Sequence, residues 1–148
     1  MGALIHNKKA SFNYELQETF SAGIELFGFE VKSARAGNGS LDGAYVIIRG
    51  NEAFLMNSFI PPFQAQNTPP DYDPRRNRKL LLLKKEIATL AALESAKGLT
   101  VVPVSMYNKG RVLKVDIAIA RGKKQFDKRE TIKKRDANRD IRRTLKNM

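Results

Sequence analysis

Residues that could carry out catalysis are few in this sequence. Its 148 residues include one histidine, His6, and no cysteine. A nucleophilic hydroxyl needs a neighbouring base, and a structural zinc ion needs several Cys or His ligands. A single imidazole near the N-terminus supplies neither arrangement. The sequence therefore predicts a protein that is not an enzyme and that holds no metal ion or cofactor.

Two other motifs could in principle bind phosphate or a cation. Gly37, Gly39 and Gly43 are spaced one residue more widely than the dinucleotide fingerprint, and strand-like rather than helical sequence follows them. We interpret these glycines as a flexible loop whose N–H groups could still meet phosphates. Asp71 and Asp73 could bind Mg²⁺ weakly, but they lie in a Pro-rich loop without further ligands.

Basic clusters offer a clearer chemistry. They are Lys8-Lys9, Lys32 with Arg35, and the run Arg75-Arg76-Asn77-Arg78-Lys79. The run stands at the start of a predicted helix, where cations lie unfavourably beside the positive end of the helix dipole. Phosphate binding would explain why cations stand at this unfavourable position. The alternative is a solvated basic loop.

The balance of charge points to a polyanionic partner. Lys and Arg number 27 against 15 Asp and Glu, a formal net charge of +12. Residues 121–148 hold 12 basic and 4 acidic side chains, so +8 of that charge lies in the last fifth of the chain. Nucleic acid and an anionic membrane are the two candidate partners. The first eleven residues have no apolar run, and Leu80–Leu83 is too short to span a bilayer, so we expect a cytoplasmic protein.

The basic C-terminal segment has too few large apolar side chains to offset the entropy of ordering it. We expect a folded body over residues 1–120 and a tail over residues 121–148 that is disordered when free. Ala137, Ile141 and Leu145 form a narrow stripe at helical spacing, so part of the tail could become helical on a partner. Phe126 has no core around it, which favours stacking on a base.

The elements that must position these residues are mostly short strands. The helical spacing of Leu80, Leu83, Ile87, Leu90 and Leu93 predicts one long helix over Arg78–Lys97. Alternation and turn signals predict strands at Phe12–Leu16, Ile24–Phe29, Ala44–Ile48, Ala53–Ile60, Leu99–Tyr107 and Arg111–Ala120. The period of Glu30–Ala36 leaves strand and helix both open. The sequence predicts a mainly β protein, an OB-like antiparallel β-barrel with flanking α-helices and a basic C-terminal tail.

A set of short blocks, in this order, resembles the SmpB family of SsrA-binding proteins of bacterial trans-translation. The blocks are Asn7-Lys8-Lys9-Ala10, Ala22-Gly23-Ile24, Gly28 with Glu30-Val31-Lys32-Ser33, Arg35 with Gly37, Asp73-Pro74, Arg76 with Arg78-Lys79-Leu80-Leu81-Leu82, Gly98-Leu99-Thr100-Val101-Val102-Pro103, and Gly122-Lys123-Lys124 with Asp127-Lys128-Arg129. Each block is weak alone, but the ordered set covers nearly the whole chain.

The resemblance implies binding to the tRNA-like domain of transfer-messenger RNA (tmRNA). It also implies delivery of that RNA, with elongation factor Tu, to ribosomes stalled on mRNA that lacks a stop codon. The body would then contact RNA through Lys8, Lys32, Arg35, Arg76, Arg78 and Lys79. Glu30 would either accept hydrogen bonds from base amino groups or orient a neighbouring cation.

The family's tail is expected to lie in the decoding centre and mRNA channel, where it becomes partly helical. Its matching residues here are Lys123, Lys124, Phe126, Asp127, Lys128 and Arg129. Phe126 stands where the family commonly has His or Tyr, so it could stack but not hydrogen-bond. Ala137 stands where many members carry Trp, which removes an aromatic contact further along the tail.

Three other functions fit parts of the pattern. A general OB-fold RNA-binding or ribosomal protein would share the charge and the fold without needing the Asp127-Lys128-Arg129 block. A membrane-surface protein would use the basic tail, but its stripe is narrow and lacks Trp. A nuclease would need a catalytic constellation that the sequence does not assemble.

Overall fold

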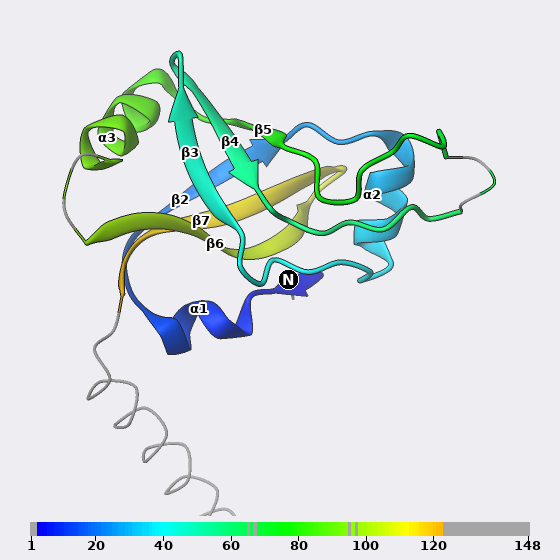
Figure 1. Ribbon diagram of the computed structural model, residues 1–148, viewed down its shortest axis with the longest axis horizontal. Helices are drawn as coiled ribbons and strands as arrows, with labels where there is room; N and C mark the ends of the chain where they lie inside the picture. The colour runs from blue at the N-terminus through cyan, green and yellow to red at the C-terminus, as the bar shows by residue number, and fades with distance from the viewer. Residues whose placement is uncertain (1–2, 65, 67, 95, 97, 123–148) are drawn as a thin grey trace, which may run out of the picture.

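One antiparallel sheet forms the centre of the molecule (Figure 1). The computed structural model describes residues 3–64, 66, 68–94, 96 and 98–122. Within those residues the sheet has seven strands in the order β1-β6-β7-β2-β5-β4-β3. Their bounds are β1 (Ile5–His6), β2 (Tyr14–Ile24), β3 (Tyr45–Arg49), β4 (Glu52–Met56), β5 (Arg78–Leu81), β6 (Leu99–Lys109) and β7 (Val112–Gly122).

The sheet coils strongly without closing into a hydrogen-bonded ring. Its edge strand β3 comes back close to β6, but no ladder joins those two strands in the described part of the chain. Neighbouring strands in a sheet are rotated relative to one another, so a seven-stranded sheet with long central strands curls in this way. The predicted OB-like, mainly β architecture is therefore confirmed in an open form.

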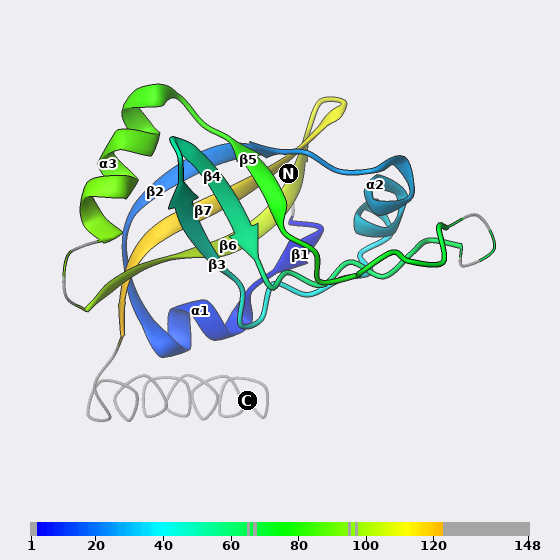
Figure 2. The ribbon, with the colours of Figure 1, turned by 45° about the horizontal axis from the view of Figure 1, so that its top comes forward.

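Three helices flank the sheet (Figure 2). They are α1 (Lys8–Asn13), α2 (Gly28–Arg35) and α3 (Lys84–Glu94). Helix α1 packs against β2 and β6, and α3 packs against β3 and β6. Helix α2 lies at the far end of the sheet, beside the long connection between β4 and β5 (Figure 1). None of the described helices is long and apolar enough to cross a membrane.

Strand β7 shows how the sequence pattern places the core. Leu113, Val115 and Ile117 are buried at alternate positions, while Lys114 and Asp116 on the other face are half-buried. Further along the strand both faces become apolar, because Ala120 packs with Ala10 of α1 in a second small cluster. Short alanine side chains there let the helix lie close to the sheet.

The long helix predicted from Arg78 to Lys97 is wrong in its first turn. Residues Arg78–Leu81 form strand β5 between β2 and β4, and the helix begins only at Lys84. Leu80 is buried opposite both Ile24 and Ala53, which gives the strand partners that helical spacing could not reveal. Tertiary pairing overrides local spacing in this segment.

Several smaller boundaries also differ from the sequence prediction, those of the first two predicted strands most clearly. Helix α1 occupies residues up to Asn13, so β2 starts at Tyr14 rather than at Phe12 and then runs on to Ile24. The predicted strand over Ile24–Phe29 is wrong, because helix α2 begins at Gly28. The two predicted hairpins, β3–β4 and β6–β7, are confirmed.

Candidate nucleic-acid interface

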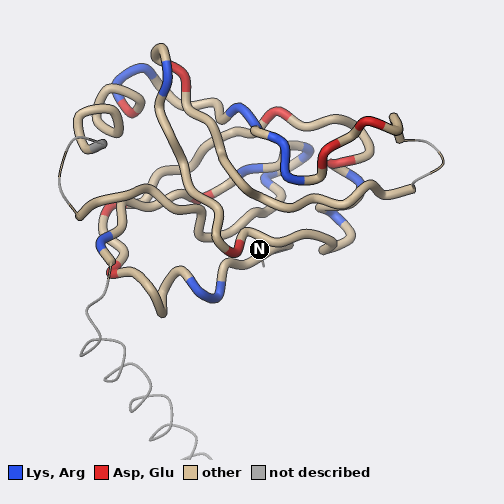
Figure 3. The backbone as a smooth tube through the Cα atoms, in the orientation of Figure 1, with Lys and Arg blue, Asp and Glu red and all other residues tan. Residues whose placement is uncertain are grey.

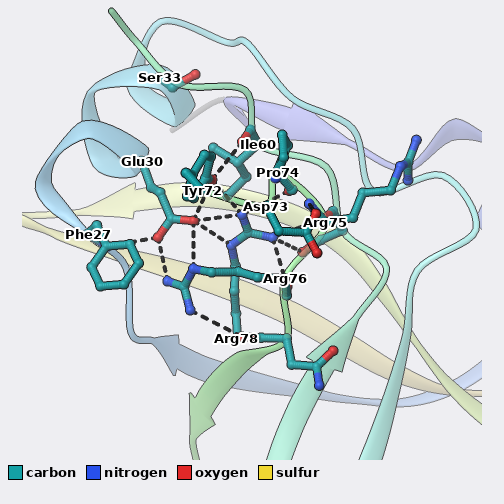
Figure 4. Close-up of polar contacts among 12 residues, drawn as sticks. Phe27, Glu30, Ser33, Ile60, Tyr72, Asp73, Pro74, Arg75, Arg76 and Arg78 are labelled. Atoms are coloured by element: carbon teal, nitrogen blue, oxygen red, sulfur yellow. Dashed lines mark hydrogen bonds and ion pairs between the residues drawn. The ribbon is translucent and has the colours of Figure 1, made fainter. Parts of the chain in front are cut away.

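Glu30 is the centre of a buried network that ties α2 to the long loop before β5 (Figure 4). Its side chain is fully buried. Oε2 accepts hydrogen bonds from Arg78 Nη2 at 2.6 Å and Arg78 Nε at 2.9 Å. Arg76 donates to both carboxylate oxygens, and the Phe27 backbone N–H donates to Oε1 at 2.8 Å. One carboxylate thus binds two guanidinium groups and also closes the first turn of its own helix.

Arg78 is a buried structural residue. Its side chain has no exposed surface. Beyond Glu30, it donates to the Ser58 carbonyl and hydroxyl, both at 3.0 Å, and to the Pro74 carbonyl at 3.0 Å. These bonds satisfy the guanidinium inside the protein, as a buried charge requires. The structure thus places Arg78, predicted as an RNA contact, where it cannot meet a phosphate without leaving this network.

The network also controls two ionisation equilibria. Burial alone would raise the pKa of Glu30, but the hydrogen bonds from Arg76, Phe27, Tyr72 and Arg78 hold it below the ordinary value of 4.5. Burial and the neighbouring carboxylate raise the pKa of Tyr72 to about 12. Glu30 is therefore an anion and Tyr72 a neutral hydroxyl at physiological pH.

Arg76 lies at the edge of this network and reaches the surface. Its side chain is 26% exposed. The guanidinium carbon stands 4.2 Å from the centre of the Phe27 ring, a cation–π contact. Phe27 in turn lies 5.6 Å from Phe29, whose ring meets Tyr72 edge-on at 4.7 Å. Glu30 thus orients Arg76. This favours the predicted role of orienting a neighbouring cation over the alternative of accepting hydrogen bonds from base amino groups.

A second basic group lies where α2 meets the tip of the β6–β7 hairpin. Arg35 Nε donates to Asn108 Oδ1 at 3.3 Å, and Arg35 Nη2 donates to the Arg111 carbonyl at 2.7 Å. We use the name hairpin cluster for the exposed basic residues of these two elements: Lys32 and Arg35 on α2, and Lys109 and Arg111 beside the hairpin turn. The acceptors of Arg35 are neutral, and no described acidic side chain forms an ion pair with any of the four. Their charge therefore remains available to a partner.

Comparison with known proteins decides the family. The family model described as SmpB protein matches residues 4–147. The chain belongs to the SmpB family. Among its relatives are SsrA-binding proteins from Gloeothece citriformis, 51% identical over 95% of this chain and 90% of the relative, and from Chloroflexus aurantiacus, 46% identical over 98% and 91%. The SsrA-binding protein of Pseudomonas entomophila is 44% identical over 99% of this chain and 91% of its own.

A solved structure supports the same assignment at the level of the fold. A chain from the structure "tmRNA-SmpB: a journey to the center of the bacterial ribosome" is similar with a TM-score of 0.68 and 42% sequence identity. The match covers 81% of this chain and 84% of that one. The open, OB-like sheet is therefore an SmpB-family fold.

The remaining predicted residues of this SmpB-family chain are scattered. Lys8 is exposed at the start of α1, whereas Glu30 lies in α2. Lys79 on β5 lies 3.4 Å from Glu52 of β4, a pair of exposed side chains. The predicted tail residues Lys123, Lys124, Phe126, Asp127, Lys128 and Arg129 lie outside the described residues, as do Ala137 and the helical stripe.

Sequence reasoning missed two cations. Lys109 and Arg111 flank the Gly110 turn of a correctly predicted hairpin, so the turn itself was the available signal.

Acidic positions come first and basic positions follow along the loop that leads into β5 (Figure 3). Asp71 and Asp73 precede Arg75, Arg76 and Arg78 there. No group of three or more His, Cys, Asp or Glu residues capable of holding a metal ion occurs within the described ranges. Within residues 71–76 two carboxylates accompany two guanidinium groups, whereas the hairpin cluster consists of cations alone.

Proposed function

We propose that this chain binds the tRNA-like domain of tmRNA and, with it, rescues bacterial ribosomes stalled on mRNA that lacks a stop codon. The observation that carries the proposal is the family match across residues 4–147. The relatives' names specify SsrA binding, and the similar solved chain comes from a tmRNA–SmpB structure concerned with the bacterial ribosome. The protein acts in this proposal by binding and positioning RNA, without a catalytic centre or a cofactor.

The hairpin cluster is the part of the body best suited to hold a structured RNA. Folded RNA presents phosphates and 2′-hydroxyls at positions fixed by its shape, and a rigid set of cations can match them. Arg35 is tied to the hairpin by two hydrogen bonds, so helix and hairpin present their charges as one surface. Lys8, Arg76 and Lys79 extend the contact, whereas Glu30 and Arg78 support it from inside.

The tail and the delivery partner complete the proposal. Residues 121–148 carry a net charge of +8, which suits a path lined by rRNA in the decoding centre and mRNA channel. Phe126 stacks on an unpaired base there, beside Asp127, Lys128 and Arg129. Elongation factor Tu delivers the complex of tmRNA and protein to the ribosome, and the protein works in the cytoplasm.

A competition titration tests the binding step. Full-length protein is titrated with the isolated tRNA-like domain of tmRNA and with an unrelated RNA hairpin of equal length, at one fixed salt concentration. We expect the tRNA-like domain to bind at least tenfold more tightly. Equal affinities would overturn the proposal and leave a general RNA-binding protein.

A further inference from the structure

A pocket lies beside Phe27 and Arg76, and Glu30, the centre of the buried network, does not line it. It has a volume of about 460 Å³. Two aromatic rings and two cations line it, together with an amide and a carboxylate: Phe27, Phe54, Arg76, Lys79, Asn77 and Glu25. Small-molecule sites in proteins typically occupy roughly 300–1,000 Å³, with a few polar groups among apolar and aromatic walls. The pocket has the size of such a site, and its lining is richer in polar and charged side chains.

One wall of the pocket is already ordered for stacking. Phe27 is 51% exposed, although exposure of a phenylalanine ring to water is unfavourable. Arg76 lies over that ring at 4.2 Å, and its Nε and Nη2 are fixed by Glu30. The ring and the guanidinium plane are held before any ligand arrives, so binding has little side-chain entropy left to remove.

The charges around the pocket favour one ligand chemistry. Lys79 is bound to Glu52 only by an exposed pair at 3.4 Å, a contact of the weak surface type that a phosphate can replace. Asn77 and Glu25 can accept hydrogen bonds from amino groups on a base. A neighbouring pocket of about 400 Å³ shares Phe27 and Arg76 but is lined by two carboxylates, Asp71 and Asp73, against that one cation. The first pocket has two cations, Arg76 and Lys79, against the single carboxylate of Glu25, so its balance of charge favours a phosphate.

We propose that this pocket binds one unpaired nucleobase of the partner RNA, stacked against Phe27 and Phe54, with its phosphate on Lys79. The proposal deepens the function proposed above and rests on it. Unstacked bases in RNA loops are commonly held by aromatic rings and guanidinium planes, and such stacking needs no particular base sequence. The pocket anchors the RNA at a second point, separate from the phosphate contacts of the hairpin cluster.

The absence of tryptophan from the chain gives this proposal a direct optical test. Phe27→Trp places a single indole in the pocket, and Phe63→Trp places one at a phenylalanine that is 45% exposed and does not line it. Each full-length variant is titrated with the tRNA-like domain of tmRNA. We expect strong fluorescence quenching with Phe27→Trp and little with Phe63→Trp. Equal quenching of the two variants would contradict the proposal.

Affinity supplies the second readout. Phe27→Ala and Phe27→Leu should each weaken binding of the same RNA about tenfold, within the range expected for removal of one base stack. The slope of log affinity against log salt should stay unchanged, because every phosphate keeps its cation. Phe63→Ala should bind like the wild type. Phe27→Leu retains an apolar side chain against Arg76, so it reports on stacking if Phe27→Ala fails to fold.

The outcomes separate this inference from the proposed function. If the wild-type protein does not prefer the tRNA-like domain over unrelated RNA, the proposed function fails. If the wild type does prefer it, while both Phe27 variants bind equally well and Phe27→Trp is not quenched, only the nucleobase pocket is wrong.

Discussion

The Glu30 network and the hairpin cluster use the same residue type for opposite purposes. In the network, Arg76 and Arg78 share one buried carboxylate, and Arg78 has no exposed surface. In the hairpin cluster, Arg35 bonds only to neutral acceptors and stays exposed. An arginine whose charge is matched inside the protein stabilises the fold, while one whose charge is unmatched at the surface is available to a polyanion. Position in the sequence does not distinguish the two.

The largest effect should come from removing the buried guanidinium. Arg78→Ala leaves Glu30 with fewer partners and deprives the Ser58 and Pro74 carbonyls of their donor. Breaking a buried ion pair costs about 3 kcal/mol or more of unfolding free energy. Urea unfolding measures it, with Arg75→Ala, an exposed side chain in the loop just before β5, as the control, expected to cost about 0.5 kcal/mol. Equal losses from the two variants would show that the network does not hold the fold together.

Acid should weaken the network next. The pKa of Glu30 is lower in the folded protein than its ordinary value of 4.5, so its contribution to stability is complete above that value. It is lost as the pH falls through the folded-state pKa. We expect the melting temperature to drop below pH 4.5 in the wild type, and this drop to be smaller in Glu30→Gln, which starts from a lower stability. Parallel melting curves of the two proteins across that range would be inconsistent with an ionised Glu30.

Removal of the exposed hairpin charges should affect binding but hardly the fold. Lys109→Ala with Arg111→Ala should lower affinity for the tRNA-like domain severalfold while the melting temperature stays within a few degrees. The matched control, Lys84→Ala with Lys85→Ala on α3, removes the same charge from two exposed positions outside the cluster. If both pairs weaken binding equally, net charge rather than the hairpin surface is responsible.

The smallest effect on stability should come from removing the tail. Strand β7 pairs with β2 as far as Gly122, two residues beyond the boundary predicted from composition, so a chain ending at Gly122 keeps the sheet whole. It should unfold cooperatively with nearly wild-type stability and bind the isolated tRNA-like domain within a few-fold. Peptide transfer to tmRNA on stalled ribosomes should be lost. Comparable losses in both assays would place the tail in RNA capture.

Local signals were enough to predict the hairpins and the OB-like, mainly β architecture, although not that the sheet stays open. The Arg49-Gly50-Asn51 and Asn108-Lys109-Gly110 turns fix two antiparallel pairs, because their Gly or Asn residues adopt positive φ. The burial of Arg78 could not be predicted in that way. Its partner Glu30 is 48 residues away, and the two meet because β5 pairs with β2, the strand that precedes α2.

The helical spacing of the leucines gave a helix that is predicted too long, for a related reason. Leu80 and Leu90 are both buried, and their positions suit one helix as well as a strand followed by a helix. Only the neighbouring strands β2 and β4 decide between those structures. The exposed cations are easier to find from the sequence. Lys32 and Arg35 stand out as basic residues, and only the contact of Arg35 with the β6–β7 hairpin requires the fold.

The salt dependence of RNA binding tests most directly whether the exposed cations of the hairpin cluster, unlike the buried arginine of the Glu30 network, bind RNA. Full-length wild type and the double variant Lys32→Ala with Arg35→Ala are titrated with the tRNA-like domain over a range of salt concentrations. The slope of log affinity against log salt should become shallower by roughly 0.7–0.9 for each phosphate that no longer meets a cation, with the fold intact. An unchanged slope and affinity in a folded double variant would contradict the assignment of RNA binding to the hairpin cluster.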